Sequence, residues 1–185
     1  MQDYHDFLAE ILIDEQTLRN RVKELADELN RDYAGEQILL ICILRGALPF
    51  LVDLMRHVTV LNAIDCMAIS SYGAGARETT GNVRMTLDLQ TNIEGKHVVL
   101  VEDIVDSGHT IAHVLEMLRT RRPKSLKVCV LLDKASRREV DVPIDYCGFT
   151  IANKFVFGYG LDLDEYYRNL PFVGVVDLER YQSSG

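Results

Sequence analysis

The chain has 185 residues, of which 20 are basic and 28 acidic, and its formal net charge is −8. Its 48% of hydrophobic residues is enough to bury a core, so we expect one folded domain over residues 1–185 rather than a disordered chain. The longest strictly apolar run, residues 38–44, is far shorter than the ~20 residues that cross a bilayer. We therefore predict no membrane partner, and the acidic balance disfavours a nucleic-acid partner.

Cysteine usage and the N-terminus point to the cytoplasm. Cys42, Cys66, Cys129 and Cys147 are scattered, without the close pairs of a zinc site, and we interpret them as reduced thiols. The first residues have neither the basic region nor the apolar core of a secretory signal. We predict a cytoplasmic protein.

The first half of the chain alternates helical and strand-like patterns. Apolar residues at helical spacing predict a helix over residues 14–31, with Asp14 as its N-cap. The next segments predict a strand at 38–44, a helix at 48–57, a strand at 63–72 and, from an alternation compatible with it, a strand at 83–89.

The second half continues this alternation. A short buried strand is expected at residues 98–101, followed by a helix that reaches about residue 122. The remaining apolar segments predict strands at 126–132, 146–151, 154–157 and 173–176. Because strands that are apolar throughout alternate with helices, we predict an α/β fold with a parallel sheet covered on both faces.

The chemistry concentrates where the strand at 98–101 ends. Two carboxylates, Glu102 and Asp103, follow it directly, Asp106 comes next, and a turn of small residues then opens the helix. Ligands of parallel sheets bind beyond the carboxyl ends of the strands, and the amides of such a turn suit a phosphate. Three carboxylates would repel that phosphate, so they suggest a ribose, a Mg²⁺ ion or both. The alternative is that Asp106 and Ser107 merely cap the helix, which leaves Glu102 and Asp103 unexplained.

Residues 101–110, Val-Glu-Asp-Ile-Val-Asp-Ser-Gly-His-Thr, resemble the phosphoribosyl-diphosphate signature of the type I phosphoribosyltransferases. Further segments are similar to those of bacterial hypoxanthine (guanine) phosphoribosyltransferases and follow in the same order, at 44–46, 70–73, 131–138 and 154–162. The resemblance implies a central, mostly parallel twisted sheet flanked by helices. It also implies a small hood formed by the terminal segments, about residues 1–15 and 150–185.

The resemblance implies an activity as well. In such enzymes a purine displaces pyrophosphate from 5-phosphoribosyl 1-diphosphate through an oxocarbenium-like transition state, with Mg²⁺ as cofactor. The expected products are IMP from hypoxanthine and GMP from guanine, with attachment at purine N9. Xanthine is a third candidate base, since all three carry a 6-oxo group. The family forms dimers and tetramers, so a homodimer or homotetramer is expected.

The signature implies roles for its own residues. Glu102 and Asp103 would hold the ribose hydroxyls and a Mg²⁺ ion, and Asp106 would be the general base at purine N7. The 5′-phosphate would be bound by Ser107, Gly108, His109 and Thr110. Some relatives have Lys or Asn where this chain has His109.

The other segments imply the rest of the site. Lys134 would donate to the purine O6, Phe155 would stack on the base, and Val156 would present backbone groups to its edge. Asp162 would lie at the purine and hold a second Mg²⁺ ion, and Arg168 would clamp pyrophosphate. Without the resemblance, Lys134 would be interpreted as a surface lysine in a turn, Phe155 and Val156 as core strand residues, and Arg168 as an exposed cation at a helix end.

Two further loops complete the implied site. The turn at Leu44-Arg45-Gly46 would bind pyrophosphate through backbone N–H groups, and the side chain of Arg45, where some relatives carry Lys, would be a further contact. The family often has a non-proline cis peptide at this turn. Ser71 and Tyr72 open a stretch that resembles the family's mobile lid.

Two other functions compete with this interpretation. One is an RNA-binding regulator that keeps the fold, although the acidic chain offers only short basic runs. The other is a sister enzyme that uses adenine, uracil or orotate, which Lys134 and the segment at 155–162 disfavour.

Overall fold

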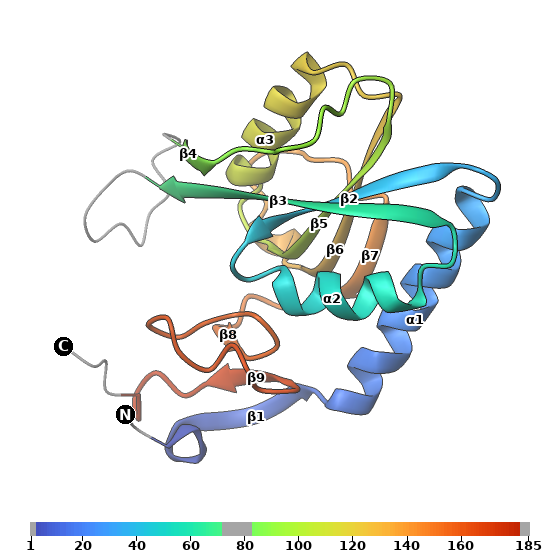
Figure 1. The fold of residues 1–185 in the computed structure, drawn as a ribbon. Helices are drawn as coiled ribbons and strands as arrows, with labels where there is room; N and C mark the ends of the chain where they lie inside the picture. Colours follow the sequence, from blue (N-terminus) through green and yellow to red (C-terminus); the bar gives the residue numbers. More distant parts are fainter. Residues whose placement is uncertain (1–2, 72–82, 182–185) are drawn as a thin grey trace.

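A six-stranded sheet forms the centre of the protein, whose computed structural model describes residues 3–71 and 83–181 (Figure 1). Its strand order is β4-β3-β2-β5-β6-β7; β4 is antiparallel to β3, and the other neighbouring pairs are parallel. The strands are β2 (Gln37–Leu44), β3 (Leu61–Ser71), β4 (Val83–Leu87), β5 (His97–Val105), β6 (Ser125–Asp133) and β7 (Tyr146–Thr150). The predicted α/β fold with a mostly parallel sheet is confirmed.

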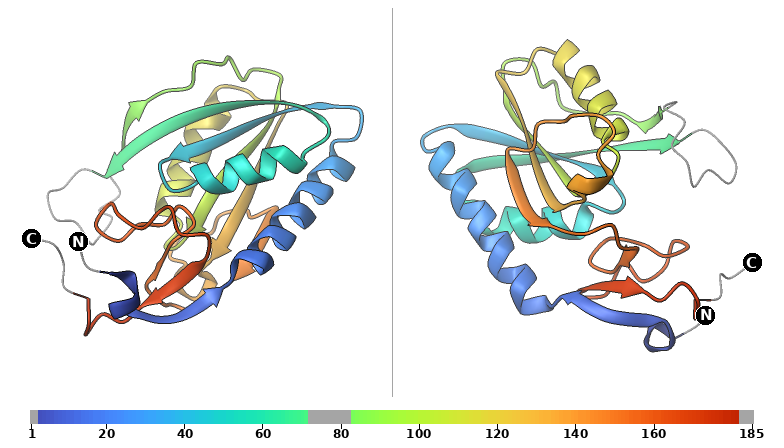
Figure 2. Two further views of the ribbon diagram at one scale, coloured as in Figure 1. Left: turned by 60° about the horizontal axis from the view of Figure 1, so that its bottom comes forward. Right: turned by 180° about the vertical axis from the view of Figure 1, so that it is seen from behind.

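Helices cover both faces of this sheet, as Figure 1 and the turned views of Figure 2 show. The helices α1 (Glu15–Asp32) and α2 (Leu48–His57) share one apolar cluster with the sheet, and α3 (His109–Thr120) belongs to the cluster on the other face. Asp14 caps α1 as predicted, since its Oδ1 accepts a 2.7 Å hydrogen bond from the Thr17 N–H. Short 3₁₀ turns lie at Tyr4–Asp6 and Ala135–Arg137.

A second, three-stranded sheet combines the terminal segments. Its order is β1-β9-β8, all antiparallel, with β1 at Leu8–Ile13, β8 at Val156–Phe157 and β9 at Val173–Val176. Its core is aromatic: the rings of Phe7 and Phe157 lie 5.4 Å apart, and both are fully buried. This sheet is the hood that the resemblance implied, although no strand was predicted for residues 8–13.

Two global expectations can be compared directly with the structure. All four cysteines are free thiols, as expected. Among the described residues, no helix has the length and apolarity needed to span a membrane.

Candidate active site

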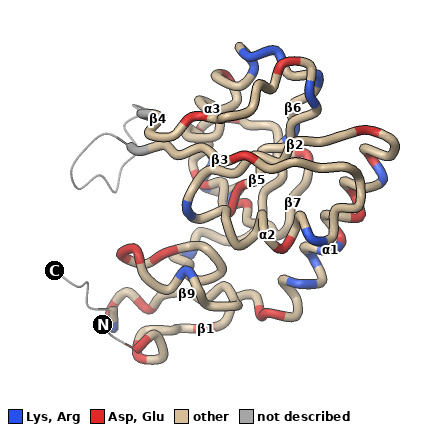
Figure 3. The backbone as a smooth tube through the Cα atoms, in the orientation of Figure 1, with Lys and Arg blue, Asp and Glu red and all other residues tan. Residues whose placement is uncertain are grey.

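The paired carboxylates Glu102 and Asp103 lie within strand β5, not beyond its end as predicted. β5 continues to Val105 because its pairing with β6 extends to Val105 and Asp133, well past the apolar residues. β5 lies between β2 and β6 in the sheet, and its acidic segment stands out in Figure 3. Glu102 is therefore only 5% exposed, and Asp103 is partly buried.

Burial controls the protonation of this pair. Desolvation raises the pKa of Glu102 well above its usual value, and the neighbouring charge of Asp103 raises it further. Burial also raises the pKa of Asp103, to about 6, although the Ile104 N–H and the charge of Arg168 both act to lower it. The Ile104 N–H donates a 2.7 Å hydrogen bond to Asp103 Oδ1. Because a bound cation favours the charged form, this pair can couple proton release to cation binding.

The turn after β2 packs directly on this pair. A Cβ atom at Gly46 would lie 1.7 Å from Asp103 Oδ2, so only glycine fits against that carboxylate. The peptide bond between Leu44 and Arg45 is cis, the state that the family often shows there. The structure thus brings together two of the segments singled out in the sequence.

The small-residue turn at residues 106–110 leads into α3. Gly108 is the N-cap, in the left-handed region at φ 92°, and no side chain caps the helix. The interpretation of Asp106 and Ser107 as capping residues is therefore wrong. Instead, the Ser107 carbonyl accepts hydrogen bonds from the N–H groups of Glu139 and Val140, at 2.9 and 3.0 Å. These hydrogen bonds attach the segment after β6 to the turn before α3. Thr110 lies in the first turn of α3.

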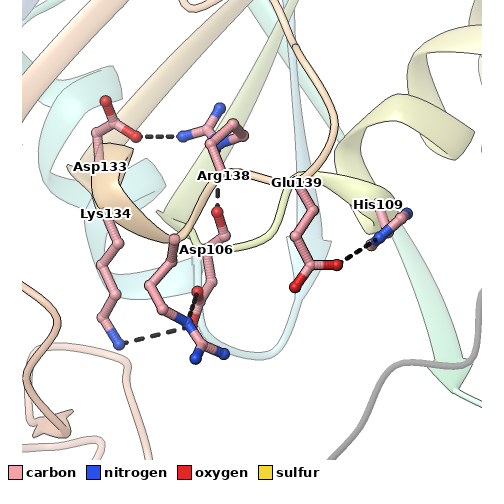
Figure 4. A network of polar contacts seen from close by, with 7 residues as sticks. Asp106, His109, Asp133, Lys134, Arg138 and Glu139 are labelled. Carbon is pink, nitrogen blue, oxygen red and sulfur yellow. Dashed lines mark hydrogen bonds and ion pairs between the residues drawn. The ribbon is translucent and has the colours of Figure 1, made fainter.

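Asp106 lies between two cations (Figure 4). Its Oδ1 is 3.1 Å from Arg137 Nε, and its Oδ2 is 3.6 Å from Lys134 Nζ. Lys134 is only 7% exposed, so its interpretation as a surface lysine is wrong. The structure places the side chains predicted for the general base and for O6 recognition next to each other.

Four residues of this network were not predicted as site residues: Asp133, Arg137, Arg138 and Glu139. Arg138 pairs with Asp133 and donates from Nε to the Asp106 carbonyl at 3.2 Å, which ties the end of β6 to the turn after β5. Glu139 lies 3.0 Å from His109 Nε2, so His109 faces a carboxylate (Figure 4). The feature of the sequence that could have indicated them is the pair Arg137-Arg138, which follows the buried strand β6 by only a few residues.

The comparisons with known proteins agree with this geometry. Residues 9–164 match the family model described as "Phosphoribosyl transferase domain". The chain belongs to the phosphoribosyltransferase family. The Salmonella typhimurium hypoxanthine phosphoribosyltransferase is 47% identical over 172 residues, which are 92% of this chain and 96% of that one. The Bacillus subtilis hypoxanthine-guanine phosphoribosyltransferase is 42% identical over 179 residues, 97% and 98% of the two chains.

Among solved structures, the crystal structure of a Staphylococcus aureus hypoxanthine phosphoribosyltransferase matches with a TM-score of 0.92 at 40% identity, over 97% of each chain. The resemblance seen in residues 101–110 is thereby confirmed, and with it the class of enzyme. The roles of individual residues in this phosphoribosyltransferase remain predictions.

The residues predicted to contact the face and edge of the purine, Phe155 and Val156, belong to the hood. Phe155 is 50% exposed, so its interpretation as a core residue is wrong, whereas Val156 is buried as a strand residue. The Phe155 carbonyl accepts a 2.9 Å hydrogen bond from the Val176 N–H, which fixes this segment on β9. An exposed aromatic ring on a fixed backbone is a suitable surface for stacking a flat base.

Arg168 organises the loop that follows β8. Its Nη2 is 2.9 Å from Asp162 Oδ1, and its Nη1 donates to the Gly160 carbonyl at 2.8 Å. A Cβ atom at Gly160 would lie 2.0 Å from the Gly46 carbonyl oxygen, so this loop touches the turn after β2. No helix is present at Arg168, which corrects its interpretation as a cation at a helix end.

The lid prediction is only partly covered by the structure. Ser71 is the last residue of β3, and Tyr72 lies outside the described residues.

The carboxyl groups of the site suit a magnesium ion that takes its remaining ligands from a bound substrate and water. Within residues 3–71 and 83–181, no group of three or more His, Cys, Asp or Glu side chains could hold a metal ion alone. Mg²⁺ typically uses one or two carboxylates and takes its other ligands from water and phosphates. The adjacent carboxyls of Glu102 and Asp103 suit that mode.

Proposed function

We propose that this phosphoribosyltransferase transfers the 5-phosphoribosyl group from 5-phosphoribosyl 1-diphosphate to N9 of hypoxanthine or guanine, releasing pyrophosphate. The observation that carries the proposal is the buried Lys134, whose ammonium group lies 3.6 Å from the Asp106 carboxylate. An ammonium donor suits a 6-oxo group, which accepts, and does not suit the 6-amino group of adenine, which donates. The relatives named above carry the names of enzymes for these bases.

The chemistry follows from where charge develops. As the bond to pyrophosphate breaks, the ribose becomes an oxocarbenium-like cation, which the carboxylates of Glu102 and Asp103 stabilise while they hold its hydroxyls. Asp106 takes the proton from purine N7 as N9 attacks. The backbone N–H groups and hydroxyls of Ser107, Gly108, His109 and Thr110 hold the 5′-phosphate at the start of α3.

The purine base and the pyrophosphate group contact the hood and the turn after β2. Phe155 stacks on the base, and the backbone of Val156 contacts its edge. Arg45, Gly46 and Arg168 bind pyrophosphate, and Ser71 and Tyr72 belong to a lid that excludes water. Glu102, Asp103 and Asp162 are the residues that would hold Mg²⁺, which when bound supplies positive charge to the leaving pyrophosphate.

Base specificity tests the proposal most directly. Pyrophosphate release is measured with hypoxanthine, guanine, xanthine, adenine, uracil and orotate in turn, with and without Mg²⁺. We expect Mg²⁺-dependent turnover with hypoxanthine or guanine and none with adenine. A preference for adenine or a pyrimidine, or binding of RNA without turnover, would contradict the proposal.

The role of Asp106 has its own test. Asp106→Asn removes the proton acceptor but keeps the size of the side chain, so kcat should fall by about 100-fold or more. The KM for 5-phosphoribosyl 1-diphosphate should stay within a few-fold, because the phosphate contacts remain. The exposed Asp141 provides the matched control, Asp141→Asn. Near-normal turnover in Asp106→Asn would remove Asp106 as the base.

We also propose a homodimer or homotetramer in the cytoplasm. Sedimentation velocity at working concentrations and fractionation of cells test the two statements separately. A monomer at every concentration would refute the first.

A further inference from the structure

One carboxylate of the hood loop, Glu165, links two arginines from distant parts of the chain. Its Oε2 lies 2.5 Å from Arg45 Nη1 and 3.3 Å from Arg168 Nη2. Arg45 follows β2 and Arg168 belongs to the hood, so the contact joins the two walls of the site. These are the two cationic side chains that the proposed function assigns to pyrophosphate.

The loop presents Glu165 by its own backbone and not only through this contact. The Glu165 N–H donates a 2.9 Å hydrogen bond to Asp162 Oδ2, and its φ is 71°. Asp164 and Tyr167 also have positive φ values, 51° and 66°. Non-glycine residues keep this conformation only where their surroundings determine it, so the loop holds Glu165 in place.

The contact is nevertheless easy to break. The side chains of Arg45 and Glu165 are 72% and 63% exposed, and exposed ion pairs contribute little to stability. Arg168 is different, since its side chain is 24% exposed and it is also held by Asp162 and Gly160. A competing anion could therefore displace the Glu165 carboxylate from Arg45 without disturbing the position of Arg168.

We propose that the Glu165 carboxylate is an internal anion that occupies the pyrophosphate position between Arg45 and Arg168 and competes with the diphosphate group for them. The inference rests on the proposed function and adds a residue that weakens binding of the diphosphate. Glu165 keeps the two guanidinium groups together in the free enzyme and gives way when the diphosphate binds. Its carboxylate thus limits how tightly product pyrophosphate is retained.

The test compares Glu165→Gln with wild type by titrating the full-length protein with inorganic pyrophosphate in the presence of Mg²⁺. Loss of the competing charge should lower the Kd for pyrophosphate by about two- to five-fold, the range that an exposed ion pair supports. The KM for 5-phosphoribosyl 1-diphosphate should fall in parallel. Glu94→Gln is the matched control, because Glu94 also pairs with an arginine, Arg122 at 2.8 Å, and the charge change is the same.

Two further measurements make the outcome decisive. In an Arg45→Gln background the effect of Glu165→Gln should shrink, since one of the two arginines for which Glu165 competes is gone. Glu165→Asp keeps the charge and should stay closer to wild type than Glu165→Gln.

An unchanged or higher Kd for pyrophosphate in Glu165→Gln would overturn the inference, as would an equal gain in Glu94→Gln. If the wild-type protein neither binds pyrophosphate nor makes a nucleotide, the proposed function itself has failed.

Discussion

Replacing Asp103 by asparagine should stabilise the folded protein at pH 8, although it removes a carboxylate that the proposed reaction uses. Burial raises the pKa of Asp103 from the model-peptide value of 3.8 to about 6. Between these two values the folded state holds a proton that the unfolded state has lost. The free energy of unfolding therefore falls as pH rises through this window, and the loss is complete above pH 6.

The magnitude follows from the size of this shift. About two pKa units at 1.36 kcal/mol each give a penalty of about 3 kcal/mol at pH 8, which shrinks to about 1 kcal/mol at pH 4.5. Asparagine carries no charge at either pH and avoids the penalty, while its carbonyl can still accept the hydrogen bond from the Ile104 N–H.

Urea unfolding of wild type and Asp103→Asn at both pH values, with EDTA present to remove divalent cations, measures the difference. The exposed Asp141→Asn serves again as the control and should show little effect at either pH. A gain for Asp103→Asn that is the same at pH 8 and pH 4.5, or no gain at all, would refute the account of burial given for this carboxyl.

Two further substitutions test the turn before α3 and the hood. Gly108→Ala should lower the free energy of unfolding by more than Gly35→Ala does. Both positions have positive φ, but only at Gly108 would the new Cβ atom lie 2.5 Å from a carbonyl oxygen, that of Val140. Equal losses of about 1 kcal/mol for the two variants in urea unfolding would contradict this. Phe155→Ala should raise the KM for hypoxanthine by about tenfold through lost stacking while changing stability little, because the ring is half exposed. The exposed Leu178→Ala is its control, and steady-state kinetics that show the same KM for both variants would remove Phe155 from the base site.

The elements set by local pattern were predicted well from the sequence. The helix at 48–57 has its predicted bounds, and the apolar runs near 38–44 and 126–132 are strands as expected. The bounds of strands that depend on pairing with distant segments were not predicted correctly. Strand β1 exists because it pairs with β9, and β5 extends over its two carboxylates because β6 continues beside it. No pattern within either segment contains that information.

The candidate site divides in the same way. The carboxylates and small-residue turn of residues 102–110 indicated a sugar-phosphate site by their chemistry alone, whereas the assignment of Lys134 and Phe155 to the purine came from the family resemblance. Contacts between side chains needed coordinates: the Arg137 contact with Asp106 joins residues that are separated along the chain by α3 and β6.

The pairing of β1 with β9 orders the assembly of the protein as it is synthesised. Every described strand of the large sheet precedes residue 151, so all of these strands are made before β9 (Val173–Val176). The small sheet forms later, because its middle strand, β9, is the last of the described strands along the chain. A polypeptide stalled before residue 173 would carry Phe155 without the neighbour that fixes it. The proposed stacking of the base on Phe155 thus depends on a strand that is made after the whole of the large sheet.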